Sequence, residues 1–307
     1  MRAQRQGAQE IAAALHRHRS TIYREIWRNS STYDGAYRPM FAVEKANGRR
    51  RRSRRNRRYG PAEFAPVERL LRRQYSPDQI VGRWKREGRP VMSHETIYGW
   101  IWRDKEQGGA LWRHLRCARK LKRKRYGRYD SRGRLAGKRM ISERPAIVQQ
   151  RVRLGDWEID TMHGRGKPCL VTVVERKSGL VRIGQLPSWT APDTLRRTLR
   201  LFRANADTVK TITADNGSEF HCYKQLERAL RARFYFATPH HAWERGTNEN
   251  TNGLIRQYAP KQTNLGTLSQ RHCNAIAATL NNRPRRRLNY LTPNEVYYSR
   301  PPVALQI

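Results

Sequence analysis

Apolar residues recur at helical spacing in the first third of the chain, where they group into two pairs of short helices. In AQEIAAALHRHRSTIYREIWRN, an Ala-rich segment predicts a helix at about residues 8–15, followed by a turn through residues 16–19. A second helix is predicted to begin near Ser20, with Ile22 and Ile26 turned inward. Two helices joined by a short turn are typical of a helix-turn-helix unit.

The second pair of helices carries clearer boundary signals. In SPDQIVGRWKREG, Ser76 and Gln79 have the spacing of a capping box, which predicts a helix over residues 77–87. After a short connection, Ser93 can cap a further helix in HETIYGWIWRD. The residues that share its apolar face are Ile97, Trp100 and Ile101. The pattern fits a second helix-turn-helix unit, although an ordinary helical hairpin has the same pattern.

From about residue 152 the apolar pattern changes to the alternation of strands. The runs VRLGDWEIDTMHG, PCLVTVVERKSG and LVRIGQLPS predict an antiparallel meander with Gly-containing turns. Helices and strands then alternate. The order is a helix in APDTLRRTLRLFRANA, a strand in TVKTITADNGSEF, a helix in YKQLERALRA, the strand RFYFATP and a last helix beginning near Trp243. The first of these helices turns Leu195, Leu199 and Phe202 inward. The order βββαβαβα predicts an α/β domain with a mixed sheet.

Charge indicates what the chain binds. Its 307 residues contain 64 Lys and Arg against 25 Asp and Glu, a formal net charge of +39, and most of the excess lies in residues 1–150. Such an excess favours a polyanion, either nucleic acid or an anionic membrane surface. Membrane is the weaker alternative, because no run of 18 apolar residues occurs, the start lacks a hydrophobic signal core, and mean hydropathy is −0.93. The four cysteines form no C-x-x-C pair, so we expect inert thiols in a reducing cytosol.

Two basic tracts separate the predicted units, RRRRSRRNRR at 49–58 and RKLKRKR at 119–125. Runs of like charge repel one another, so we interpret both as linkers or arms along DNA phosphates, with a solvated tail as the alternative. Candidate contacts in the tracts are Arg52, Arg54, Lys122 and Arg123. Candidate contacts on the second helices of the two helix-turn-helix units are Thr21, Tyr23, Arg24, Arg28, His94, Glu95, Thr96 and Tyr98.

Three acids in the second half suggest chemistry. Asp160 lies in the first predicted strand, where Asp156 and Glu158 share its face, while Asp215 ends a later strand and Glu249 lies on the last helix. Three carboxylates from separate elements can cluster only around a cation, and two Mg²⁺ ions about 3.5–4 Å apart would serve phosphoryl transfer. The alternative is scattered surface acids, with Glu249 making weak pairs on a solvated helix face.

The chain resembles transposases of the insertion sequence thirty family, within the DDE class whose core is similar to retroviral integrase and ribonuclease H. The matching segments run in order over nearly the whole chain: STIYREIWRN, SPDQIVGR, SHETIYGWI, ISERPAIV, GDWEIDTMHG, TADNGSEF, WERGTNENTNGLIRQY and NNRPRRRLNYLTPNEV. The resemblance implies that Asp160, Asp215 and Glu249 form the catalytic, metal-binding triad. It also implies that Arg256 contacts the DNA end, and Arg245 is a further candidate for contact with DNA. Mn²⁺ is expected to substitute for Mg²⁺.

The resemblance implies a transposase that binds the inverted repeats of its element and cuts and joins strands of double-stranded DNA, including target DNA. We expect a ribonuclease-H-like core with a mixed five-stranded sheet, a homodimer or higher oligomer on DNA, and a bacterial cytoplasmic, nucleoid-associated location. The alternatives are a DNA-binding regulator without catalysis and a metal-dependent nuclease or resolvase.

The same resemblance, together with the basic tracts, predicts how the chain is divided. Family members carry more sequence ahead of the first helix pair, so we expect that unit to be incomplete. The predicted parts are a first helix-turn-helix at 1–48, a basic linker at 49–60, a second helix-turn-helix at 61–116, a basic linker at 117–150, and the catalytic domain with its C-terminal helices at 151–307.

Overall fold

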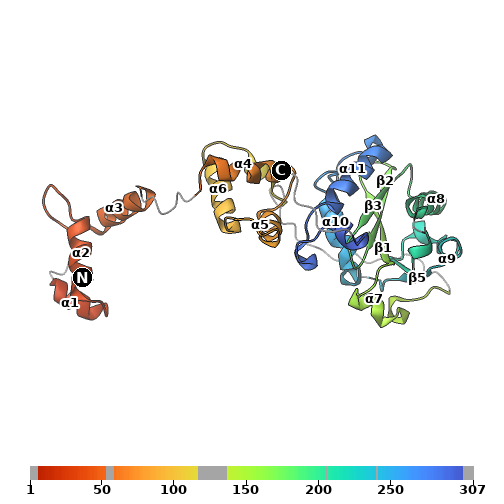
Figure 1. Ribbon diagram of the computed structural model, residues 1–307, viewed down its shortest axis with the longest axis horizontal. Coiled ribbons are helices and arrows are strands. Elements are labelled where there is room, and N and C mark those ends of the chain that lie inside the picture. Colours follow the sequence, from red (N-terminus) through yellow and green to blue (C-terminus); the bar gives the residue numbers. More distant parts are fainter. Residues whose placement is uncertain (1–5, 53–58, 117–136, 205, 240, 300–307) are drawn as a thin grey trace. The chain divides into compact units, whose positions relative to one another are not determined.

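A computed structural model describes residues 6–52, 59–116, 137–204, 206–239 and 241–299 (Figure 1). The chain divides into two compact units, Met1–Phe64 and Ala65–Ile307, and each is described by itself.

The first unit contains a small helical core. Helices α1 (Ala8–Ala14) and α2 (Arg19–Asn29) are those expected from the apolar pattern, and Ala8, Ile11, Ala12 and Ile22 are buried between them with Ile26 partly covered. Helix α2 begins one residue earlier than predicted, because the His18 side chain, and not that of Ser20, caps it by accepting the Ser20 N–H.

A third helix of the first unit changes the expected division at residue 48. Helix α3 (Pro39–Arg52) continues through the first four residues of the basic tract that we predicted to be a linker. Arg49 donates to Asn29 Oδ1 at 2.6 Å and Lys45 to the Ser30 carbonyl at 2.5 Å. These bonds tie α3 to the C-terminal end of α2, so residues 49–52 belong to a helix and not to a linker.

The two capped helices of the second predicted helix-turn-helix begin at the expected residues. This helix-turn-helix comprises α4 (Pro61–Arg72), which spans the border between the two units, α5 (Pro77–Arg86), α6 (His94–Glu106) and a 3-10 turn, η3 (Leu111–His114). Ser76 and Gln79 form the capping box of α5, and Ser93 caps α6 by accepting the Thr96 N–H. Ile97 and Ile101 are fully buried, as the pattern of α6 predicts.

The remaining part contains the expected mixed five-stranded sheet. Its strands are β1 (Asp156–His163), β2 (Cys169–Glu175), β3 (Val181–Leu186), β4 (Thr211–Ala214) and β5 (Arg233–Phe236), in the order β3-β2-β1-β4-β5. β1, β2 and β3 form the antiparallel meander, whereas β1, β4 and β5 are parallel. The helices that follow the strands are α8 (Ala191–Phe202), α9 (Tyr223–Leu230) and α10 (Gly246–Ile255), so the predicted order βββαβαβα is confirmed.

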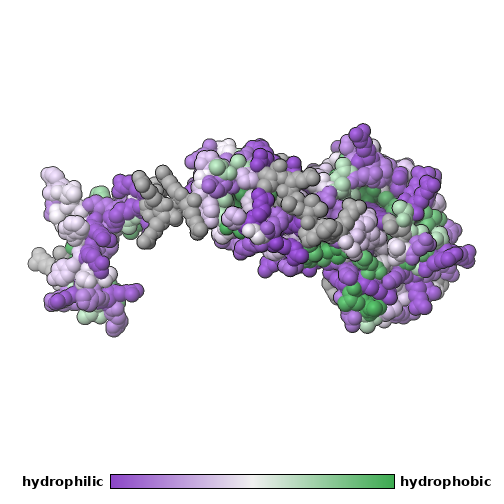
Figure 2. All heavy atoms as spheres, in the orientation of Figure 1, coloured by the Kyte–Doolittle hydropathy of each residue, from purple (hydrophilic) through white to green (hydrophobic). Residues whose placement is uncertain are grey.

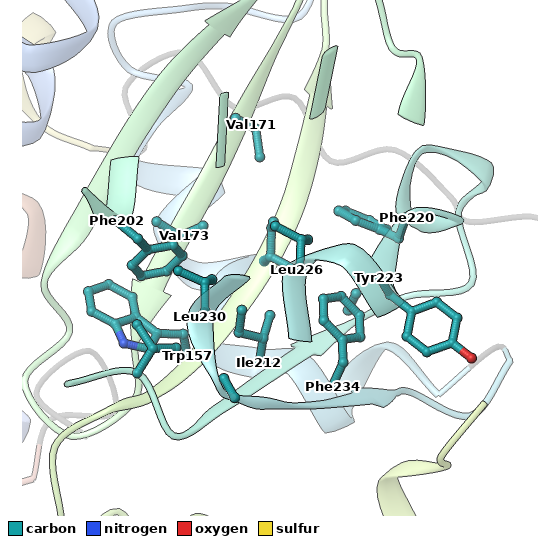
Figure 3. Close-up of a cluster of buried hydrophobic side chains, with 14 of the residues drawn as sticks. Trp157, Val171, Val173, Phe202, Ile212, Phe220, Tyr223, Leu226, Leu230 and Phe234 are labelled. Carbon is teal, nitrogen blue, oxygen red and sulfur yellow. The ribbon is translucent and has the colours of Figure 1, made fainter. Parts of the chain in front are cut away.

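Helices cover both faces of the sheet (Figure 1). On one face, Trp157 and Ile212 of the sheet pack with Phe202 of α8 and Leu226 and Leu230 of α9 (Figure 3). On the other face, a second core forms between the sheet, α10 and α11 (Gln270–Asn281). The short 3-10 turns of this part are η4 (Ile141–Glu143), η5 (Ala206–Thr208), η6 (Ser218–Phe220), η7 (Ala242–Arg245), η8 (Leu265–Thr267) and η9 (Arg286–Leu288).

A buried ion pair joins α5 to the C-terminal helix α12 (Pro293–Tyr297). The Arg83 guanidinium, fully buried, donates to both oxygens of Glu295 at 2.9 and 2.6 Å and also pairs with Glu87. Tyr290 lies against Gly82 of α5, where an added Cβ would meet its ring at 2.2 Å, and donates to Asp78. The second helix-turn-helix is therefore part of the same compact unit as the sheet, which differs from the separate domain that we predicted.

The predicted linker at 117–150 also proves to be partly structured. Residues 137–150 contain η4 and α7 (Ala146–Gln150), and the Phe236 N–H donates to the Arg139 carbonyl beside β5. Local sequence gives little sign of this, because the segment gains its hydrogen bonds from a strand that lies far along the chain.

The visible surface is largely hydrophilic (Figure 2), in keeping with the charge of the chain. Among the described helices, none combines the length and the apolar character needed to cross a membrane.

We predict that Glu295→Ala lowers the free energy of unfolding by about 3 kcal/mol, since it leaves the buried Arg83 guanidinium without its main counter-charge. Urea unfolding followed by circular dichroism measures the change. The control is Glu68→Ala, which removes an exposed i,i+4 pair with Arg72 and should cost less than about 1 kcal/mol. Equal losses in the two variants would show that the Arg83–Glu295 contact contributes nothing specific.

Candidate active site

Two of the three predicted acids lie close together where β4 ends beside β1. β1 and β4 are parallel neighbours, with Glu158 opposite Thr213. Two residues further along each strand lie Asp160 and Asp215, so parallel pairing alone brings them to the same level. Asp215 directly follows β4, and its Oδ1 accepts the Gly217 N–H at 3.0 Å in the turn that follows. This is the edge where ligands bind in open α/β sheets.

The guanidinium of Arg245 lies between these two carboxylates. Its Nη1 is 3.2 Å from Asp160 Oδ1, and its Nη2 is 3.1 Å from Asp215 Oδ2. The Arg245 side chain is only 15% exposed, so both contacts are partly shielded from water. We predicted that a cation must lie among the acids, and the structure places a guanidinium against two of them. Arg245 was expected to contact DNA, whereas its charged group here is directed at Asp160 and Asp215.

Burial and charge act in opposite directions on this cluster. Burial raises the pKa of Asp160, and the nearby Asp215 carboxylate adds to that effect, while Arg245 opposes it. Burial alone would lower the pKa of Arg245, but its attraction to Asp160 and Asp215 outweighs burial and raises it. The guanidinium therefore opposes the effect of burial on Asp160, and the attraction is mutual.

Helix α10 carries the third acid and also supplies a second hydrogen-bond donor to Asp160, in addition to Arg245. Asn252 Nδ2 donates to Asp160 Oδ2 at 2.6 Å, and Asn252 Oδ1 accepts from the buried Thr172 hydroxyl at 3.1 Å. Arg245, Glu249 and Asn252 follow one another at spacings of four and three residues, so they share one face of the helix. Glu249 thus lies between two residues that contact Asp160, and it is exposed.

The three acids are not gathered around a common point. Across the residues that the structure describes, no group of three or more His, Cys, Asp or Glu side chains is arranged to hold a metal ion. Asp160 and Asp215 are brought together, while Glu249 lies on the adjoining helix face. The role of Glu249 as a ligand therefore stays a prediction.

Arg256, directly after α10, forms a hydrogen bond with the end of β1. Its Nη2 donates to the carbonyl of His163, the last residue of β1, at 2.7 Å, and its Nη1 donates to the Ala259 carbonyl at 3.3 Å. Burial lowers the pKa of this guanidinium. Its predicted contact with the DNA end stays a prediction.

The predicted DNA contacts on the helix-turn-helix units lie at the surface to different extents. Thr21, Tyr23, Arg24 and Arg28 are all exposed on α2, and so is Arg52 at the end of α3. On α6, His94 is exposed and lies 3.2 Å from a carboxylate oxygen of Glu95, whereas Thr96 and Tyr98 are half-buried. Arg54, Lys122 and Arg123 lie outside the described residues.

Sequence reasoning did not identify Asn252 or Thr172 as parts of the site. The signal was present in the run NENTN, where Asn252 follows Glu249 by three residues and so shares its helix face. A polar Thr172 within the apolar run LVTVV was the second sign, because a buried hydroxyl needs a hydrogen-bond partner.

Several known proteins are similar in sequence to this chain along most of its length. The transposase for insertion sequence element IS4351 of Bacteroides fragilis is 42% identical over 288 residues, which cover 94% of this chain and 88% of the relative. The transposase for IS1086 of Cupriavidus metallidurans is 38% identical, with 93% and 87% covered. Transposase InsI for IS30A of Escherichia coli is 35% identical, with 93% and 77% covered. No protein-family model matches the chain.

These similarities, found along nearly the whole chain, define its class as that of the transposases of insertion sequences. The chain belongs to the insertion sequence thirty (IS30) family of transposases. Among solved structures, the catalytic core domain of BIV integrase matches with a TM-score of 0.38 and 23% identity, covering 47% of this chain and 94% of that one.

We predict that Arg245→Ala lowers the free energy of unfolding at pH 7 by about 2 kcal/mol in the presence of a chelator, because two carboxylates lose their charged hydrogen-bond donor. The loss should be smaller near pH 4.5. Without Arg245 the pKa of Asp160 in the folded chain rises further, so the folded chain holds a proton that the unfolded chain releases above about pH 4. Stability of the variant then falls as pH rises through this window.

Urea unfolding at the two pH values measures this effect. The matched control is Arg196→Ala, which removes an exposed ion pair with Asp193 and should cost less than about 1 kcal/mol at either pH. A pH-independent loss in Arg245→Ala would contradict the role of this guanidinium as the counter-ion of the two acids.

Proposed function

We propose that this transposase cuts DNA at the ends of its element and joins the freed 3′ ends to target DNA, with Asp160, Asp215 and Glu249 as the ligands of two divalent metal ions. One observation carries the proposal. Asp160 and Asp215, from neighbouring parallel strands, approach a single guanidinium to within 3.2 Å, so the site is built to hold positive charge between them.

The donor set suits Mg²⁺, and Mn²⁺ as its substitute. Mg²⁺ prefers a few carboxylate oxygens and completes its shell with water and phosphate oxygens. Asp160 and Asp215 provide such oxygens at one sheet edge, and α10 carries Glu249 on the face that contacts Asp160. The Asn252 amide oxygen already accepts from Thr172, so we assign Asn252 to orienting Asp160 and not to binding metal. The chemistry that two bound ions supply in phosphoryl transfer is activation of the attacking oxygen and stabilisation of the leaving one.

In this proposal the basic residues that flank the two ends of α10 have separate roles. Arg245 turns from the carboxylates to DNA phosphate when substrate and metal are bound, which reconciles its contacts with its predicted role. Arg256, at the C-terminal end of the same helix, orients the DNA end beside the acids. Water, and then a DNA 3′-hydroxyl, is the attacking group, and no covalent enzyme intermediate forms.

DNA binding is assigned to the two helix-turn-helix units and the basic segments. The exposed residues of α2 and the net charge of +39 support contact with the phosphates of the terminal inverted repeats. Two ends must be joined together, so we propose that the active form is a homodimer or a higher oligomer on DNA.

Family membership argues against a regulator without catalysis. A nuclease or resolvase would use the same acids but release the cut ends. A strand-joining assay distinguishes these activities, because only a transposase yields covalent products between element ends and target DNA.

We predict that Glu249→Gln reduces Mg²⁺-dependent cleavage and joining by about a hundredfold or more, in the range seen when one preorganised electrostatic contact is lost. The amide keeps the size of the side chain and its helix propensity but is a weaker ligand than a carboxylate. Cleavage and joining of labelled end DNA measure the effect, and end binding is measured by gel shift.

The control for Glu249→Gln is Asp207→Asn, which removes one carboxylate charge from an exposed position in η5 and should leave both activities unchanged. Normal joining by Glu249→Gln would mean that Glu249 belongs to a solvated helix face. Loss of end binding together with joining would mean that Glu249 has a structural role instead.

We predict that the full chain binds a duplex carrying its inverted repeat without any metal, with affinity falling about 10³-fold or more between 50 and 200 mM salt if six or more phosphates are contacted. Fluorescence anisotropy in the presence of a chelator measures this dependence. A scrambled duplex of equal length serves as the control and should bind more weakly with a salt dependence of its own. Affinity that does not change with salt would contradict the assignment of the basic surface.

A further inference from the structure

The start of α10 is held against β1 by the buried carboxylate of Glu158. This residue lies two positions before Asp160 on the same strand face and is fully buried. Its Oε2 accepts the backbone N–H of Asn248, the third residue of α10, at 2.9 Å. The first N–H groups of a helix have no partner within the helix and lie at the positive end of its dipole, so a carboxylate there is stabilising.

The second oxygen of Glu158 is paired with Arg176, which follows β2 and is 2% exposed. Arg176 also donates to the Val148 carbonyl at 3.2 Å and to Gln149 Oε1 at 3.3 Å, both in α7. This pair therefore connects β1, the end of β2, α7 and α10. Glu158 is fully buried, and both of its oxygens accept hydrogen bonds from within the protein.

A second anchor lies one helical turn further on, where Asn252 donates to Asp160. The anchors on α10 are four residues apart, which is about 6 Å along a helix, and their partners on β1 are two residues apart, which is about 6.6 Å along a strand. The two spacings match, so the helix can make both contacts without tilting. Glu249 lies between these anchors, directly after Asn248.

Two anchors at matched spacing set both the position of α10 along β1 and its rotation about its own axis. We infer that Glu158, together with Arg176, is a positioning residue that holds the start of α10, and with it the backbone of Glu249, beside the strand of Asp160. The inference rests on the proposed function, in which Glu249 is a metal ligand. Glu158 acts only through the helix that it holds.

The test is Mn²⁺ binding to the full-length chain without DNA, measured by isothermal titration calorimetry. The variant is Glu158→Gln combined with Arg176→Met, which removes both buried charges while the amide can still accept the Asn248 N–H. We expect Mn²⁺ affinity to fall about tenfold or more, the range for groups that orient metal ligands. The Mn²⁺ concentration that half-saturates strand joining should rise by a similar factor.

A matched control is available in the other buried pair, Arg83 and Glu295, which lies at the contact of α5 with α12. Arg83→Met combined with Glu295→Gln removes a buried pair of the same kind away from the acids. It should bind Mn²⁺ as the unaltered chain does, even where its thermal stability falls. A purely structural effect of losing a buried ion pair would lower Mn²⁺ affinity in both double variants.

Arg176→Lys provides a second, milder test, since it keeps the charge next to Glu158 but removes the fork that reaches α7. Its Mn²⁺ affinity should fall in the same direction by a smaller factor. If Glu158→Gln with Arg176→Met does not fold, this variant decides, and unchanged affinity overturns the inference.

The variant Glu249→Gln distinguishes a failure of the positioning role from a failure of the proposed function. If it weakens Mn²⁺ binding while the Glu158 and Arg176 variants do not, the positioning role is wrong and the proposed function stands. If Glu249→Gln leaves Mn²⁺ binding unchanged, Glu249 is no ligand, and the proposed function fails together with the inference.

Discussion

Two neighbouring carboxylates repel each other when both are ionised, and a cation between them offsets the repulsion. This constraint organises the site. Parallel pairing of β1 with β4 brings Asp160 and Asp215 to one level, and the Arg245 guanidinium bridges them. Arg245 immediately precedes α10, so the attraction that balances the acids also draws that helix to β1. The residue that bridges two of the acids therefore stands directly before the helix that carries the third.

Buried ion pairs connect segments of the chain that local structure would leave apart. Glu158 with Arg176 joins the strand of Asp160 to α7 and α10, and Arg83 with Glu295 joins the second helix-turn-helix to the C-terminal helix. Burying such charges is costly, so their main effect is on geometry and not on the free energy of folding. In this chain one pair joins α5 to α12, and the other joins α7 and α10 to β1.

Local patterns predicted the secondary structure well because caps and periodicity act over a few residues. Such patterns account for the capping box of α5, the N-cap of α6 and the three-stranded meander. They also place Asp160 in the first strand and Asp215 at the end of a later one. The pattern could not predict that Arg245 faces the acids, or that Arg83 pairs with Glu295, 212 residues away. These contacts depend on the packing of whole elements. The prediction of a linker from residue 49 was wrong for the same reason. The first residues of the basic tract extend α3, and Arg49 donates a hydrogen bond to Asn29 of α2.

The most direct test of the account is a crystal structure of the full chain with Mn²⁺ and a duplex carrying the element's end, with the ions located by anomalous scattering. The account predicts Mn²⁺ bound by carboxylate oxygens of Asp160, Asp215 and Glu249, with the Arg245 guanidinium withdrawn from both aspartates onto DNA phosphate. Ions located away from Asp160 and Asp215, or bound there while Glu249 faces solvent, would contradict it.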